Sequence, residues 1–273
     1  MLRRAGCSPR PGSRMNCAPM SDAADISEDS VLGGLLRLRQ PTSGHRAGHD
    51  AILLAAATAA RPGDRVVDLG AGVGTAGLAL ARRVGGLALT LVEREPLLAD
   101  LARDNARENE LQADVVLLDV AADAAAFAAA ELGPDSIDVV LMNPPFHDPA
   151  RHRASPNAAR ATAHMATATT LEIWTHAARR MLKSGGLLTL IWRADGLAEI
   201  LAVLSRGFGS LALQPVYGQP GRPAIRILVR AIKGGRAPTQ ILAGVMLNEA
   251  GGAPSAEMLR VLAGQGALAL AAP

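Results

Sequence analysis

Aromatic residues are scarce in this chain of 273 residues: they make up 2% of it, as three Phe, two Trp and one Tyr. The core must therefore be built from Ala, Leu and Val, and an aromatic residue in a polar or loop setting is informative. Cysteine is also rare, and both cysteines, Cys7 and Cys17, lie near the N-terminus. This position excludes a disulfide framework and a zinc cluster built on cysteine.

Long apolar runs and a strong charge imbalance are missing as well. Every apolar run is broken by Arg, Asp or Gly well before the roughly 18 residues that a membrane span requires. The net charge of +3 permits a nucleic-acid partner but does not indicate one by itself. The chain does have 49% hydrophobic and 19% charged residues, which is enough for a sizeable core. We expect a cytoplasmic protein with no membrane segment and no metal site.

The beginning of the chain differs in composition from the rest. Residues 1–20 contain four Arg, three Pro and no acidic residue. They hold neither the apolar segment of a secretory signal nor the apolar stripe of a transit helix. We expect residues 1–30 to be a disordered extension and residues 31–273 to form a single, monomeric domain.

From about residue 31, short apolar segments alternate with helical ones. Continuously apolar strands between helices indicate a parallel sheet that is covered on both faces. Two later segments, 211–218 and 224–234, are expected to form an antiparallel pair. The predicted fold is therefore α/β, with a doubly wound, mostly parallel seven-stranded sheet and an antiparallel C-terminal strand pair. The other predicted strands are 65–72, 87–95, 113–120, 136–146 and 187–193. The predicted helices are 49–60, 75–84, 96–110, 121–132, 167–182 and 195–206.

A glycine-rich turn follows the first of these strands. The sequence from Asp68 to Gly74 reads D-L-G-A-G-V-G, and Glu93 closes the next strand. Residues 72–77 read G-V-G-T-A-G, which is also the pattern of a dinucleotide-binding turn and leaves an NAD-dependent dehydrogenase open. A carboxylate at Asp68 would oppose a pyrophosphate at the helix N-terminus. It suits a cationic cofactor such as a sulfonium amino acid, which glycines allow to approach the backbone closely.

The fourth predicted strand ends in Asn143-Pro144-Pro145-Phe146. Proline cannot continue a central strand, and two prolines stiffen the backbone while their carbonyls remain free to accept hydrogen bonds. The Asn143 amide oxygen and the Pro144 carbonyl then form a fixed pair of acceptors for the two hydrogens of a planar amine, and Phe146 stacks on its ring. Methyl transfer to such an amine depends on positioning and electrostatics rather than on a strong base. We predict that these four residues are catalytic.

These motifs resemble those of known enzymes. The D-x-G-x-G-x-G turn with its following acid resembles class I S-adenosylmethionine-dependent methyltransferases, whose fold is Rossmann-like. The Asn-Pro-Pro-Phe string resembles the (N/D)PP(Y/F) motif of amino-methyltransferases. The segment from Gln40 to Leu54, and the basic strand and short helix near the C-terminus, look like those of the tRNA1(Val) adenine-N6 methyltransferase family. The resemblance covers about residues 40–262.

The resemblance implies S-adenosylmethionine as cofactor and N6 of an adenine in a tRNA anticodon loop as methyl acceptor. Asp68 and the glycine turn would hold the amino-acid end, Glu93 both ribose hydroxyls and Asp119 the adenine amine. Asp50 either helps to hold the cofactor or caps its helix. The predicted cofactor-binding residues are Asp50, Asp68, Gly70, Gly72, Gly74, Glu93 and Asp119.

Basic residues follow the Asn-Pro-Pro-Phe string. We predict that His147, Arg151 and Arg153 contact the tRNA, or another structured RNA, with the arginines on phosphates. A second basic group near the C-terminus offers further phosphate contacts, at Arg222, Arg226, Arg230, Lys233 and Arg236.

Other acceptors remain open. The string N-P-P-F-H also resembles ribosomal-RNA guanine-N2 methyltransferases, and related motifs serve protein-glutamine methyltransferases. Those enzymes typically carry a further domain, for which this chain has little room. The NAD-dependent dehydrogenase is the alternative from outside the class.

Overall fold

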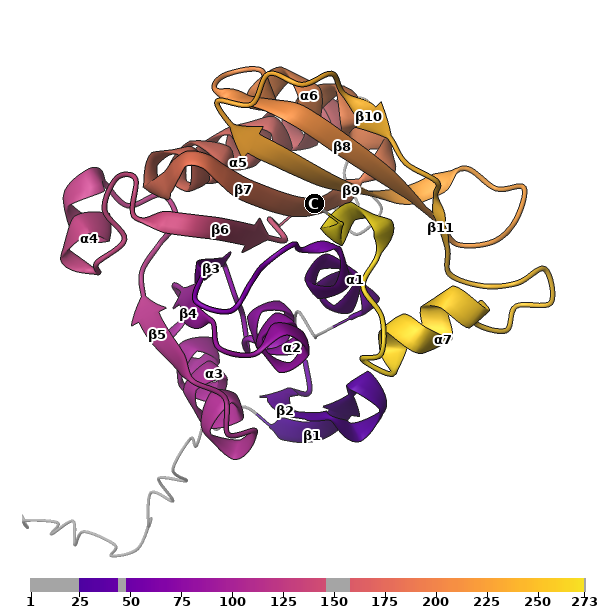
Figure 1. Cartoon of the computed structure of the whole chain (residues 1–273), viewed down its shortest axis with the longest axis horizontal. Coiled ribbons are helices and arrows are strands. Elements are labelled where there is room, and N and C mark those ends of the chain that lie inside the picture. The colour runs from indigo at the N-terminus through magenta and orange to yellow at the C-terminus, as the bar shows by residue number, and fades with distance from the viewer. Residues whose placement is uncertain (1–24, 44–47, 146–157, 273) are drawn as a thin grey trace, which may run out of the picture.

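The computed structural model describes residues 25–43, 48–145 and 158–272 (Figure 1). A twisted central sheet orders its long strands β5-β4-β3-β6-β7-β9-β8, with neighbouring strands parallel from β5 to β7 and antiparallel on both sides of β9. The bounds are β3 Arg65–Leu69, β4 Ala88–Glu93, β5 Ala113–Leu117, β6 Ile137–Met142, β7 Leu182–Arg193, β8 Phe208–Tyr217 and β9 Ala224–Lys233.

The predicted architecture is confirmed, with one addition to the strand number. The seven long strands and their antiparallel C-terminal pair are present as expected. Two strands of two residues each, β10 Gln240–Ile241 and β11 Val245–Met246, also pair with β8, so the sheet has nine strands within the described residues. Strands this short leave no alternating pattern that the sequence could reveal.

Helices cover both faces of the sheet. One face carries α1 His49–Ala57, α2 Thr75–Val84 and α3 Pro96–Glu108, and the other carries α4 Ala124–Ala129, α5 Ala158–Met181 and α6 Leu197–Leu204. Successive residues of the central strands are buried in opposite cores: Val139 packs with α1 and α2, and Val140 packs with α5. Because side chains alternate across a strand, the strands had to be apolar at every position.

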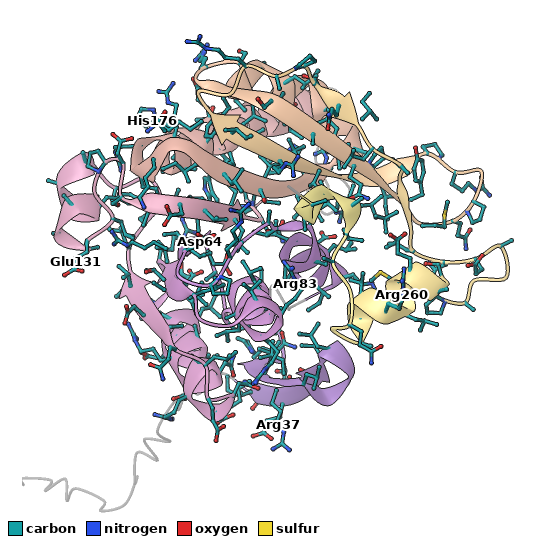
Figure 2. The ribbon with its side chains drawn as sticks, in the orientation of Figure 1. Arg37, Asp64, Arg83, Glu131, His176 and Arg260 are labelled. Atoms are coloured by element: carbon teal, nitrogen blue, oxygen red, sulfur yellow. The ribbon has the colours of Figure 1, made fainter. Side chains whose placement is uncertain are left out.

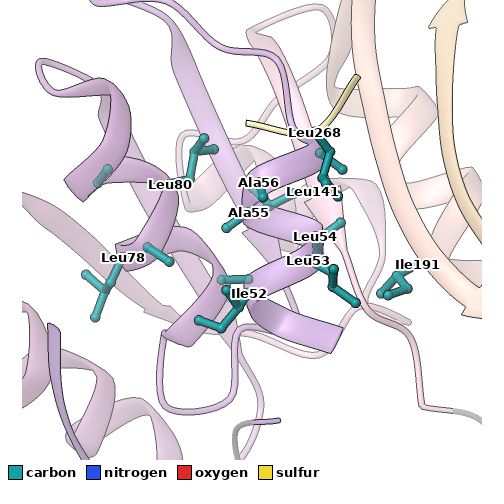
Figure 3. Close-up of a cluster of buried hydrophobic side chains, with 14 of the residues drawn as sticks. Ile52, Leu53, Leu54, Ala55, Ala56, Leu78, Leu80, Leu141, Ile191 and Leu268 are labelled. Carbon is teal, nitrogen blue, oxygen red and sulfur yellow. The ribbon is translucent and has the colours of Figure 1, made fainter. Parts of the chain in front are cut away.

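Helix α1 lies deep in the first core. Its residues Leu53 and Leu54 are fully buried and face the sheet near Leu141 and Ile191 (Figure 3). The helix ends at Ala57 rather than at the predicted residue 60.

The end of α1 is closed by polar groups. The Thr58 hydroxyl donates to the Leu54 carbonyl at 2.7 Å, and the Arg83 guanidinium from α2 donates to the Ala55 carbonyl at 3.0 Å (Figure 2). These bonds satisfy carbonyls that a helix end leaves without partners. Burial lowers the pKa of Arg83.

Several other predicted boundaries are wrong: for example, β7 begins at Leu182 instead of residue 187, and β6 ends at Met142 instead of residue 146. Helix α5 begins at Ala158 instead of residue 167, and α4 spans only Ala124–Ala129 because Asp123 caps it, with its carboxylate accepting from the Ala126 N–H at 2.9 Å. None of the helices within the described ranges is long and apolar enough to cross a bilayer.

The described residues begin with a hairpin, of which the sequence predicted only residues 31–40, as a short strand or hairpin. Strands β1 Ile26–Val31 and β2 Leu36–Pro41 pair antiparallel, joined by the turn η1 Leu32–Gly34. The expected disordered extension to residue 30 is therefore wrong for residues 26–30, while residues 1–24 lie outside the described part. The hairpin lies beside α2 and α3 (Figure 1).

The C-terminal segment returns to the first core. After α7 Ala256–Leu262, the Leu268 N–H donates to the Ala56 carbonyl at 2.8 Å, and Leu268 is buried against α1 (Figure 3). The short turn η4 Ala269–Ala271 then brings the Leu270 carbonyl within 3.0 Å of the Arg230 guanidinium. The turn η3 Ala194–Gly196 links β7 to α6.

Candidate active site

The glycine turn connects β3 to α2 at the carboxyl edge of the sheet. Gly70, Gly72 and Gly74 have φ angles of +73°, +57° and +89°, a region that favours glycine. The N–H groups of Gly70 and Ala71 both donate to the Val92 carbonyl at 2.9 Å, which fixes the turn to the end of β4. The three glycines are thus explained by the positive φ angles that the turn requires at their positions.

Asp68 lies beneath this turn and is only 2% exposed. Its Oδ2 accepts from the Gly77 N–H of α2 at 2.7 Å. A Cβ at Gly77 would come within 3.1 Å of the Asp68 carboxylate and 2.6 Å of Leu91, so the close approach requires glycine. Burial raises the pKa of Asp68 to about 7; the Gly77 N–H opposes the rise and the charge of Glu93 adds to it.

Glu93 ends β4 and is 7% exposed. Its Oε2 accepts from the Gly72 N–H at 2.8 Å, and its Oε1 accepts from the N–H groups of Arg94 and Glu95 at 2.8 and 2.9 Å. A carboxylate has about four acceptor positions, so only Oε2 retains an open one. Glu93 therefore holds the turn in shape, and its predicted contact with the cofactor stays a prediction.

Asp119 lies beyond β5, and its side chain is 51% exposed. Its Oδ1 accepts from the Ala121 N–H at 2.8 Å, and its Oδ2 lies 3.8 Å from an Arg94 guanidinium nitrogen. Asp119 does not cap the following helix, since Asp123 does so. Its predicted contact with the adenine amine stays a prediction.

Asp50, in the first turn of α1, forms an ion pair with Arg226 of β9. Its Oδ2 accepts from the Arg226 Nε of β9 at 2.9 Å. The N-cap of α1 is Gly48, without a side-chain cap bond, so the capping alternative for Asp50 is wrong. Its predicted role toward the cofactor is not tested by this contact.

Asn143 follows β6 directly and lies next to the glycine turn. Leu69 of β3 pairs with Met142 of β6, so Gly70 and Asn143 leave adjacent strands at the same level. The Asn143 amide oxygen is buried and has no hydrogen-bond partner among the described residues, and Pro144 is buried beside it. A buried carbonyl without a donor costs roughly 1–3 kcal/mol. The end of β6 is therefore arranged to receive a hydrogen-bond donor.

Several predicted site residues cannot be placed. Phe146, His147, Arg151 and Arg153 lie outside the described residues. Of the C-terminal basic group, Arg226, Arg230 and Lys233 bond to acceptors of the protein itself, since Lys233 reaches Asp135 at 2.8 Å and the Leu182 carbonyl at 2.6 Å. These bonds give Arg226, Arg230 and Lys233 a structural role, whereas Arg222 and Arg236 are exposed and remain candidates for phosphate contact.

Two residues near the turn were missed by sequence reasoning. Trp174 of α5 is partly buried against the second core, as expected of a core-edge residue, and its indole also lies against Gly70: a Cβ there would be 2.1 Å from Trp174 Cη2. Asn105 of α3 is fully buried and donates to the Val73 carbonyl inside the turn at 2.9 Å. The available signals were the scarcity of aromatics for Trp174, and a polar residue on the buried face of a helix for Asn105.

The surroundings of these residues are also informative. Among the described residues, no three His, Cys, Asp or Glu side chains gather as a metal site would require. A cavity of about 460 Å³ opens beside the first residues of α1 and α2, lined by residues that include Gly48, His49 and Thr75. It adjoins the glycine turn at Thr75, whereas Asp68, Glu93 and Asn143 lie outside its lining.

This chain belongs to the methyltransferase small domain family, whose model matches residues 46–214. Membership argues against the dehydrogenase that the glycine pattern left open. The chain is 28% identical over 200 residues to the tRNA1(Val) (adenine(37)-N6)-methyltransferase of Dickeya chrysanthemi, which covers 72% of this chain and 77% of that protein.

Solved structures agree with this family. A protein from Agrobacterium tumefaciens, described as a predicted O-methyltransferase, superimposes with a TM-score of 0.67 at 33% identity, over 80% of this chain and 98% of that one. The 16S rRNA N2 G1207 methyltransferase of T. thermophilus, solved with AdoMet and guanosine, superimposes with a TM-score of 0.53 at 20% identity, over 79% and 52%. The latter shows the same fold.

Proposed function

We propose that this protein uses S-adenosylmethionine to methylate an exocyclic amine, N6 of an adenine in a tRNA anticodon loop. The observation that carries the proposal is the buried amide oxygen of Asn143, next to the glycine turn, which has no hydrogen-bond partner among the described residues. The similarity to the Dickeya tRNA enzyme supports adenine and tRNA as substrate. A tRNA substrate suggests that the protein acts in the cytoplasm, and we propose a monomeric catalytic domain.

The residues around the turn fit the donor. No atom of the described residues lies within 4 Å of the position that a Cβ at Gly72 would occupy, which supports an approach of a ligand to the backbone there. Glu93 retains an acceptor position on Oε2 for a ribose hydroxyl, and Asp68 brings a carboxylate toward a cationic amino acid. Asp119 and Asp50 complete the proposed cofactor set. When bound, S-adenosylmethionine would supply an electrophilic methyl group on a sulfonium.

The end of β6 would orient the acceptor. The Asn143 oxygen and the Pro144 carbonyl accept the two amine hydrogens, which directs the nitrogen lone pair away from the adenine plane. Both acceptors are held by a rigid proline backbone, so little reorganisation is needed during transfer. The amine nitrogen then carries positive charge that these oxygens stabilise, and its extra proton can leave to solvent afterwards. We propose that Phe146 stacks on the base and Pro145 keeps the turn rigid.

A base inside a folded RNA must be exposed before it can reach this site. Anticodon loops already present unstacked bases, which lowers the cost of inserting one. We propose that His147, Arg151 and Arg153, together with the exposed Arg222 and Arg236, contact the RNA backbone.

The acceptor is tested by its product. The purified protein should be incubated with isotopically labelled S-adenosylmethionine in three separate reactions, which contain bulk tRNA, ribosomal RNA or a release factor. The products should then be analysed by mass spectrometry of nucleosides and peptides. We expect N6-methyladenosine in tRNA. Methylguanosine from ribosomal RNA, methylglutamine, or a methyl ether would each overturn the proposed acceptor, the last in agreement with the name of the Agrobacterium structure.

A further inference from the structure

Two buried asparagines, Asn105 of α3 and Asn109 at its C-cap, bind the backbone of the N-terminal hairpin. Asn105 accepts from the Arg39 N–H at 2.7 Å and donates to the Arg39 carbonyl at 3.1 Å. Asn109 does the same with Arg37, at 2.9 and 2.7 Å. A side-chain amide has the donor and acceptor of a peptide group, so the pair replaces a neighbouring strand along the free edge of β2.

The two asparagines differ in one contact. The Asn105 amide also donates to the Val73 carbonyl at 2.9 Å. The Asn109 amide instead donates its second hydrogen bond to the Asn105 backbone carbonyl in α3, at 2.7 Å. Val73 lies between Gly72 and Gly74 and is itself buried. Asn105 therefore connects the hairpin, α3 and the middle of the glycine turn through one side chain.

The turn needs such an anchor because glycines give its backbone wide freedom. Its beginning is held by the Val92 carbonyl, and Gly72 is held by Glu93. The Asn105 amide holds the next residue, Val73, by its carbonyl. Together these contacts fix the backbone groups that would face the donor.

We infer that Asn105 is a positioning residue for the donor site, and that through it the hairpin of residues 26–41 contributes to cofactor affinity. The inference rests on the proposed use of S-adenosylmethionine at the glycine turn. It adds to the site a residue that contacts neither donor nor acceptor, and a hairpin that precedes the sheet.

The matched pair of asparagines supplies the experiment. Asn105→Asp and Asn109→Asp each keep an acceptor oxygen, lose the N–H donor and add one buried charge beside the edge of β2. Titration calorimetry with S-adenosylmethionine and thermal unfolding should be measured for both. We expect about tenfold or greater loss of affinity for Asn105→Asp and less than about threefold for Asn109→Asp, because only the first frees a carbonyl of the turn. Both should lower Tm.

A second pair keeps the test decisive if the aspartates do not fold. Asn105→Ser and Asn109→Ser remove the same bonds without adding charge, and the same difference in affinity is expected. Equal losses of affinity at the two positions, or none at position 105, would show that Asn105 serves stability alone and would overturn the inference.

A spectroscopic measurement separates this inference from the proposed function. Trp174 contacts Gly70 at the start of the turn, and Trp192 is the second of the two tryptophans. In a Trp192→Phe background, the emission of Trp174 without any cofactor should shift in Asn105→Asp and remain unchanged in Asn109→Asp. If the unmutated protein bound no S-adenosylmethionine but the emission still shifted, the proposed cofactor would fail while the anchoring of the turn would stand. An unchanged emission would overturn the anchoring.

Discussion

The two halves of the carboxyl edge of the sheet are prepared in different ways. On the donor side, formed by Asp68, the glycine turn and Glu93, the polar groups bond to one another: Gly77 to Asp68, Gly72 to Glu93. On the acceptor side, at the end of β6, the Asn143 oxygen is buried with no partner among the described residues. The side proposed to bind the methyl donor is thus assembled in advance. On the side proposed to bind the methyl acceptor, the Asn143 oxygen still needs a group that donates a hydrogen bond to it.

This difference predicts that one side contributes to cofactor affinity and the other to stabilisation of the transition state. A preformed donor side loses little conformational entropy on binding, so its residues should affect mainly cofactor affinity. A buried hydrogen-bond acceptor that has no partner among the described residues interacts most strongly with a group that gains positive charge. Asn143 should therefore affect mainly the rate of methyl transfer. Substitutions on the two sides should therefore separate in Kd and kcat.

The largest effect is expected from Asn143→Ala. This change removes one of the two oxygens that hold the amine, and kcat should fall by about 10³-fold. Affinity for S-adenosylmethionine should change by less than about threefold, because the donor side remains intact. Single-turnover methyl transfer and calorimetry measure the two quantities. A near-normal kcat would refute the acceptor-pair mechanism, and a parallel loss of affinity would show that the two sides are not separate.

Asp68→Asn should weaken cofactor binding by roughly 10- to 100-fold, because a charged hydrogen-bond partner becomes neutral. The pH dependence sharpens this expectation. The pKa of Asp68 is raised from 3.8 to about 7, so between these values the folded protein holds a proton that the unfolded chain has lost. Stability from this group is therefore full below about pH 4 and is lost as the pH rises through about 7.

A cationic ligand favours the ionised form, so affinity for S-adenosylmethionine should rise from pH 6 to pH 8 in the unmutated protein. Asp68→Asn should lose that pH dependence and, at pH 8, have a higher Tm than the unmutated protein, since no charge is buried. Calorimetry and thermal unfolding at both pH values test this. Flat binding profiles for both proteins would remove Asp68 from the donor side.

Gly70→Ala tests the contact between the turn and α5. The left-handed φ of +73° costs roughly 1–2 kcal/mol for alanine, and the new Cβ would lie 2.1 Å from Trp174, which adds about 1–3 kcal/mol of overpacking. Gly63→Ala is the matched control, since φ is +91° there but no atom lies within 4 Å of a Cβ. Urea unfolding should show the larger loss for Gly70→Ala, and Trp174→Leu should recover part of it. Equal losses at the two glycines would show that Trp174 gives way freely.

The sequence predicted the backbone of the glycine turn well because its residues are local. The glycines mark backbone angles that other residues avoid, and α2 has the predicted bounds of residues 75–84. The end of β6 was equally clear, since prolines stop a strand. Asn105 and Trp174 were missed because their roles depend on which helix packs against the turn, and no local pattern records that.

The N-terminal hairpin shows the same limit. Strand β1 reads I-S-E-D-S-V, with polar residues at its centre, so composition favoured disorder. Its pairing with β2, and the amides of α3 on the other edge of β2, decide its structure. Non-local hydrogen bonds of this kind leave no periodicity in a short segment.

The smallest effect is expected from Asp50→Asn, which sharpens the boundary of the donor side. Asp50 is held by Arg226 of β9, and both side chains are about one-quarter exposed, so the pair should contribute only about 0.2–1 kcal/mol. If this ion pair is its main role, the substitution should change affinity for S-adenosylmethionine by less than about threefold, and Arg226→Gln should lower the free energy of unfolding by a similar amount. Calorimetry and urea unfolding of both variants decide between the roles. A tenfold loss of affinity in Asp50→Asn alone would extend the donor side to Asp50 itself, whereas the same loss in Arg226→Gln as well would show that the ion pair orients Asp50 toward the cofactor.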